Sequence, residues 1–119
     1  MTNKSSDPAE AINWESSEVA ERRNRGRARR AELQGPATEL MLDLAEVRTG
    51  IRVLDVAAGT GDQTVMAAQR VGPTGYVLAT DISASMLKLA ADTAREAGLT
   101  NVETRVPDGQ APGRTCVRY

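Results

Sequence analysis

The sequence contains no histidine and no phenylalanine, and it has only one cysteine, one tryptophan and two tyrosines. Without a second cysteine no internal disulfide can form, so a reducing compartment fits the chain. With no histidine to activate it, Cys116 is better explained as an incidental thiol than as a nucleophile. The shortage of aromatic residues leaves a core of valine, leucine, isoleucine, methionine and alanine.

An excess of charge of one sign is also lacking. The chain carries 15 Lys and Arg against 16 Asp and Glu, so no overall field attracts nucleic acid or an anionic membrane. No apolar run is long enough to span a bilayer, and residues 1–8 have no signal-peptide core, so we expect a cytoplasmic protein. At 119 residues the chain forms at most one domain.

Composition divides the chain into three segments. Residues 1–34 form a polar N-terminus with an arginine-rich helix from about Ala9 to Gln34, residues 35–110 form the domain, and residues 111–119 form a polar tail. The arginines of residues 22–30 could belong to a nucleic-acid arm. Acids flank them and no aromatic residue interleaves to stack on bases, which favours a solvated helix face.

The domain alternates helical patterns with short apolar runs. Gly35 and Pro36 are expected to break the chain before a helix over 37–47, whose Leu40, Leu44 and Val47 should pack on the sheet. Further elements are predicted as strands over 52–57, 75–81 and 101–106, and as helices over 62–70 and from Ser83, as the N-cap, to Gly98, as the C-terminal cap.

The order of these elements predicts an α/β fold with a parallel sheet. Ligands on such sheets bind beyond the carboxyl ends of the strands. Asp55, Asp81 and Asp108 lie in or just after the three successive strands, at or near that end. An ordinary core pattern would have apolar residues at these positions, so the three acids are candidates for binding a ligand.

The stretch from Val53 to Asp62, VLDVAAGTGD, is the centre of the pattern. It predicts a buried strand, a tight glycine loop and the start of a helix, whose first N–H groups lack intrahelical acceptors. Glycines let the backbone approach a ligand closely. A carboxylate at Asp55 inside a covered strand requires a partner, and a ligand's ammonium group is one candidate.

This stretch resembles motif I of the class I S-adenosylmethionine-dependent methyltransferases, particularly the branch containing the ubiquinone/menaquinone biosynthesis enzymes. The resemblance extends from about Gly35 to about Gln110 and covers only the front half of that family's domain. It implies a partial Rossmann-like methyltransferase fold with three parallel strands and flanking helices. Strands four to seven of the family's sheet are missing from it.

A dinucleotide site is the competing interpretation of the loop. That site needs G-x-G-x-x-G, but Thr64 stands where the third glycine would be. Asp55 would repel a pyrophosphate and attract the positively charged amino-acid end of S-adenosylmethionine. Asp81 suits either ligand, since a carboxylate at the end of the second strand can accept both ribose hydroxyl protons.

The resemblance also implies a set of cofactor-binding residues. It places one group around the methionine portion of S-adenosylmethionine, namely Asp55, Ala57, Gly59, Thr60 and Gly61. It makes Asp81 the ribose-binding acid, sets Ile82 and Met86 near the adenine, and matches Asp108 to the acid that contacts the adenine amino group. It nominates no catalytic base, and no metal site is predicted.

The predicted function is that of the cofactor-binding half of a methyltransferase that acts on an unidentified small-molecule acceptor. The alternative is a non-catalytic binding fragment, or a module completed by a partner chain. The chain alone is expected to be inactive. We also expect the central strand, Arg52 to Ala57, to have one unpaired apolar edge through which copies self-associate, and we expect no nucleic-acid or membrane partner.

Overall fold

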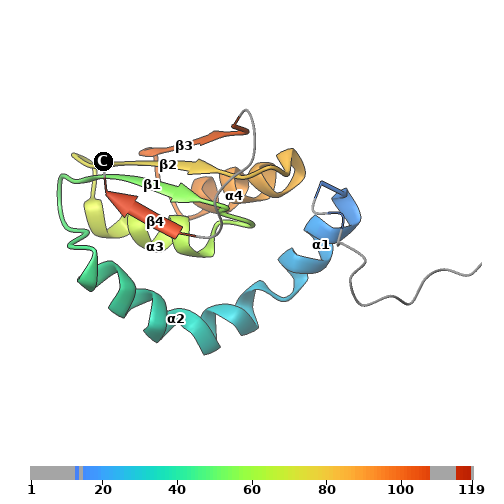
Figure 1. Ribbon diagram of the computed structural model, residues 1–119, viewed down its shortest axis with the longest axis horizontal. Coiled ribbons are helices and arrows are strands. Elements are labelled where there is room, and N and C mark those ends of the chain that lie inside the picture. Colours follow the sequence, from blue (N-terminus) through green and yellow to red (C-terminus); the bar gives the residue numbers. More distant parts are fainter. Residues whose placement is uncertain (1–12, 14, 108–114, 119) are drawn as a thin grey trace, which may run out of the picture.

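The computed structural model describes residue 13, residues 15–107 and residues 115–118 (Figure 1). One mixed sheet has the strand order β3-β2-β1-β4. Its strands are β1 (Arg52–Val56), β2 (Tyr76–Thr80), β3 (Val102–Arg105) and β4 (Thr115–Arg118). Four helices accompany it within the described residues: α1 (Ser17–Arg25), α2 (Arg27–Leu44), α3 (Asp62–Val71) and α4 (Ala84–Glu96).

The first three strands form the parallel sheet that the sequence predicts. Val53 of β1 is in register with Val77 of β2, which is in turn in register with Val102 of β3. Asp55 lies opposite Ala79. The α/β class and the three parallel strands are therefore confirmed, and the carboxyl ends of β1 and β2 meet at one edge.

The outer edge of β1 differs from the prediction. β4 pairs with β1 in the antiparallel direction, from Val53 opposite Arg118 to Val56 opposite Thr115. The prediction of an unpaired edge is wrong at these residues, since 115–118 supply the hydrogen-bonding partner. Self-association through this edge of β1 loses its structural basis.

The break in the N-terminal helical region lies at Gly26 instead of Gly35 and Pro36. Gly26 separates α1 from α2, and α2 continues through Pro36 to Leu44. Proline removes one helical hydrogen bond, but the C-terminal half of α2 is held by tertiary contacts. Leu42 is fully buried in the core, and Arg70 of α3 pairs with Glu39 and Asp43. Packing thus overrides the local preference for a break.

The core lies between the sheet, α3 and the C-terminal end of α2. Its main cluster of buried residues comprises Leu42, Val47, Val53, Ala67, Ala68, Val71 and Val77. Val47 packs there as predicted, but Leu40 and Leu44 are 58% and 76% exposed. Leu40 and Leu44 therefore lie on the solvent-facing side of α2, because Leu42 is the residue that faces the core. In Figure 1, α2 lies below the sheet and outside α3.

The caps of α4 agree with the sequence. The Ser83 hydroxyl accepts a hydrogen bond from the Met86 N–H at 3.1 Å, as an N-cap does. Gly98 follows the helix with a φ of +77°, and the Leu99 N–H donates to the Ala94 carbonyl. Of the helices in the described part of the chain, none is long and apolar enough to cross a membrane.

Candidate functional site

The loop between β1 and α3 has the conformation that its glycines predict. Ala57, Gly59 and Gly61 all have positive φ angles, of +59°, +63° and +95°. The Ala58 N–H donates to the Thr80 carbonyl at 2.9 Å, which ties the loop to the end of β2. Three of the five residues from Ala57 to Gly61 thus have a left-handed backbone conformation. They turn the chain sharply from the strand into α3, so the loop lies over the carboxyl end of β1.

Gly61 also has a packing role. A Cβ atom at this position would lie 2.9 Å from both Cα and Cβ of Ala90 in α4. The absence of a side chain therefore allows the loop to contact α4 directly. This close approach, between residues far apart in the sequence, is one that no local pattern indicates.

Asp55 is completely buried beneath the loop. Its carboxylate accepts a hydrogen bond of 2.6 Å from the Thr64 hydroxyl and one of 3.1 Å from the Gln63 side-chain amide. The partner that a buried carboxylate requires is thus supplied by the first turns of α3. Thr64 occupies the position of the third glycine of a dinucleotide motif and is itself fully buried.

Asp81 joins the loop to α4. One carboxylate oxygen accepts the Gly59 N–H and the other accepts the Ser83 N–H, both at 2.9 Å. The side chain is 6% exposed. The structure therefore brings this predicted ribose-binding acid to the glycine loop, at the edge of the sheet where β1 and β2 both end.

The remaining predicted residues are placed unequally. Ile82 follows Asp81 and is 39% exposed, whereas Met86 is 2% exposed in the first turns of α4. Thr60 is buried within the loop. Asp108 lies outside the described residues. The loop, Asp55, Asp81 and Ile82 thus meet at one end of the sheet.

Two arginines of the N-terminal cluster also reach this site. Arg30 donates through Nη2 to the Thr60 hydroxyl at 3.3 Å and to the Asp62 carboxylate at 3.4 Å. Nε of Arg27 lies 3.8 Å from the same carboxylate, and Arg27 donates to Thr93 of α4. The sequence alone favours a solvated face for this cluster. The spacing of Arg27 and Arg30 predicts that they lie on one side of a helix. Their contacts with Thr60, Asp62 and Thr93 are visible only in the folded structure.

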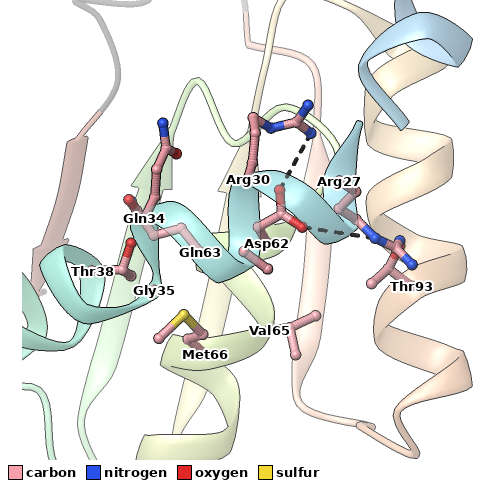
Figure 2. A pocket seen from close by; sticks show the side chains of 11 residues that line it. Arg27, Arg30, Gln34, Gly35, Thr38, Asp62, Gln63, Val65, Met66 and Thr93 are labelled. Atoms are coloured by element: carbon pink, nitrogen blue, oxygen red, sulfur yellow. Dashed lines mark hydrogen bonds and ion pairs between the residues drawn. The ribbon is translucent and has the colours of Figure 1, made fainter. Parts of the chain in front are cut away.

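A cavity of about 250 Å³ lies beside these arginines. Figure 2 shows its residues from α2, including Arg30, Gln34 and Thr38, facing Gln63 and Met66 of α3. Gln63 lines the cavity and also donates to Asp55. The cavity therefore adjoins the residues that support the glycine loop.

Comparison with known proteins identifies relatives over this same region. Residues 37–112 match the ubiE/COQ5 methyltransferase family. The ubiquinone/menaquinone biosynthesis C-methyltransferase of Pseudomonas savastanoi pv. phaseolicola is 52% identical over 63 residues, which are 52% of this chain and 25% of that protein. Nocamycin O-methyltransferase of Saccharothrix syringae is 42% identical over 77 residues, which are 65% of this chain and 28% of that protein.

Solved structures show the same similarity. Coclaurine N-methyltransferase, bound to N-methylheliamine and SAH, matches with a TM-score of 0.60 and 28% identity, over 65% of this chain and 22% of that one. The chain spans about a quarter of the length of the curated relatives that it matches. The match to residues 37–112 contains the glycine loop, Asp55 and Asp81.

Proposed function

The chain belongs to the ubiE/COQ5 methyltransferase family, and from that membership we propose that it binds S-adenosylmethionine at the loop from Ala57 to Gly61. The observation that carries the proposal is the position of Asp81, whose carboxylate joins the loop to α4 through the N–H groups of Gly59 and Ser83. This carboxylate lies at the carboxyl end of β2, where a parallel sheet binds its ligands.

The residues of the site fit this cofactor. Each oxygen of Asp81 accepts one N–H group, and a carboxylate has about four acceptor positions. Asp81 therefore retains the capacity to accept hydroxyl protons of a ribose. The side chain of Asp55 is fully buried and bonded to Thr64, so its negative charge acts on the amino-acid end of the cofactor through the loop instead of by direct contact.

Asp55 and Thr64 also argue against a dinucleotide. A third glycine in that motif allows the helix to pack closely on the strand, whereas here the Thr64 hydroxyl makes that connection by donating to Asp55. A buried negative charge beneath the loop disfavours a pyrophosphate and favours a ligand with a positive charge. The proposal is therefore S-adenosylmethionine and not NAD.

The proposed reaction is the transfer of a methyl group to a small-molecule acceptor. When bound, the cofactor supplies a methyl group on a positively charged sulfur. The residues of this chain contribute by positioning: Asp81 and the loop fix the cofactor, and the desolvated site brings the acceptor in line. The names of the relatives include a C-methyltransferase and an O-methyltransferase, so the acceptor atom does not follow from them.

A second candidate function follows from the length of the matched region. Since the chain corresponds to about a quarter of its relatives, it could act as a cofactor-binding fragment without catalysis, or as a module completed by a partner chain. Methyl transfer by the chain alone, with a mixture of quinone precursors and other small acceptors, would support the first candidate and show that the expectation of an inactive chain is wrong. Cofactor binding without transfer would favour the second.

Isothermal titration calorimetry tests the cofactor proposal. We expect the chain to bind S-adenosylmethionine and its demethylated product, and Asp81→Ala to weaken that binding by about 1–3 kcal/mol, the range for hydrogen bonds to a charged group. Asp92→Ala is the control, because Asp92 lies on α4 and pairs with Arg95 at the surface. Tighter binding of NAD, or an unchanged affinity of Asp81→Ala, would refute the assignment.

A further inference from the structure

The cavity beside α2 has a surplus of positive charge. Among the described residues that line it, the guanidinium groups of Arg27 and Arg30 face a single carboxylate, that of Asp62. The distances of 3.8 and 3.4 Å from Asp62 are long for ion pairs with strong hydrogen bonds. One negative charge therefore neutralises only half of the positive charge on this side of the cavity.

Arg30 retains donors for a further group. Among the described residues its guanidinium contacts Thr60 and Asp62, in both cases through Nη2. Arginine has five N–H donors in a planar fork that matches a carboxylate. The side chain of Arg30 is 19% exposed, so a carboxylate that binds to it is partly shielded from water.

The opposite side of the cavity is apolar. Val65 and Met66 of α3 line it there, while Gln34 and Thr38 of α2 add polar groups further along α2 from the arginines (Figure 2). A ligand that fits both sides has an apolar body and a single anionic group. The volume of about 250 Å³ limits it to a small molecule.

Two residues that line the cavity hydrogen-bond to residues of the proposed cofactor site. Gln63 lines it and donates to Asp55, and Arg30 lines it and donates to Thr60 of the glycine loop. We propose that this cavity binds a small molecule with one carboxylate on an apolar body, and that this molecule is the methyl acceptor. The acceptor role rests on the proposed function, whereas the carboxylate site rests on the cavity alone.

Benzoate and its neutral isostere benzamide test the site in titrations of the full 119-residue chain. We expect saturable binding of benzoate, at least about tenfold tighter than that of benzamide, and a loss of about tenfold or more in Arg30→Gln, because a hydrogen-bonded charge is removed. Arg29→Gln is the matched control, since Arg29 is an exposed neighbour on α2 outside the cavity lining. It should bind benzoate like the parent chain.

A second variant covers the case in which Arg30→Gln does not fold, as judged by circular dichroism. Ala31→Phe places a ring against the cavity from an exposed helical position and should abolish benzoate binding. Equal affinities for benzoate and benzamide, no benzoate binding, or benzoate binding unchanged in both variants would each overturn the proposal.

The same titration with saturating S-adenosylhomocysteine separates the two proposals. We expect benzoate to bind alongside it. Displacement of benzoate would assign the cavity to the carboxylate of the cofactor itself and overturn the proposal. If S-adenosylhomocysteine does not bind at all, the proposed function fails, while the benzoate measurements still decide whether the carboxylate site exists.

Discussion

The Thr64 hydroxyl donates a hydrogen bond of 2.6 Å to the carboxylate of Asp55, and both side chains are fully buried. This bond links the first turns of α3 to the C-terminal end of β1, beneath the glycine loop. It gives a buried negative charge a partner from the protein, as burial of a charge requires. The strand before the loop and the helix after it are thus joined directly by side chains.

Replacing Thr64 tests this link. Thr64→Val keeps the shape of the side chain but removes the hydroxyl, so we expect a loss of about 1–3 kcal/mol in the free energy of unfolding, measured with urea. Thr64→Ser retains the hydroxyl and should recover part of the loss. Thr104→Val, at a half-buried position in β3, is the control. A Thr64→Val chain as stable as the parent would show that the bond does not matter for stability.

Gly61→Ala should destabilise the chain strongly. The new Cβ would lie 2.9 Å from Cα of Ala90, at a residue with a φ of +95°. Strain at the positive φ and overpacking against α4 together predict a loss of about 2–4 kcal/mol, measured by thermal or urea unfolding. Gly35→Ala is the control, because no described atom beyond its chain neighbours and the surrounding backbone of α2 lies within 4 Å of its new Cβ, and alanine favours a helix by about 0.5–1 kcal/mol. Similar effects of the two substitutions would contradict the packing argument.

Ala57→Gly should have the opposite effect. Ala57 has a φ of +59°, a conformation that costs a residue with a Cβ roughly 1–2 kcal/mol. Relief of this strain exceeds the entropy that glycine gains in the unfolded chain, so we expect a stabilisation of about 0.5–1 kcal/mol in urea unfolding. Ala37→Gly, at an exposed position within α2, should instead cost about 1 kcal/mol. A destabilised Ala57→Gly chain would indicate that the methyl group contributes more than the strain.

The arginine cluster is not expected to bind nucleic acid. Glu18, Glu21 and Glu32 are interspersed with it, and the overall charge of −1 provides no concentrated positive field for a chain of phosphates. Fluorescence anisotropy with duplex DNA and RNA at physiological salt should show no micromolar binding. Such binding, if abolished by the triple replacement of Arg27, Arg29 and Arg30 with glutamine, would show that this expectation is wrong.

The local features of the site are those that the sequence could predict. The glycines of the loop, the acids at the ends of β1 and β2, and the caps Ser83 and Gly98 each depend on residues within a few positions of one another. Their backbone conformations follow from steric limits and from the hydrogen-bonding needs of strand and helix ends. Membership of the family followed from the same stretch.

The tertiary structure decided the features that depend on distant contacts. Leu42, instead of Leu40 and Leu44, faces the core, and α2 passes through Pro36 because contacts with α3 hold it. Arg30 meets Thr60, and β4 covers the edge of β1, only after the chain has folded. Local preferences amount to less than about 1 kcal/mol for most residues and to about 3 kcal/mol for a proline inside a helix. Several packing and charge contacts between distant segments outweigh them together.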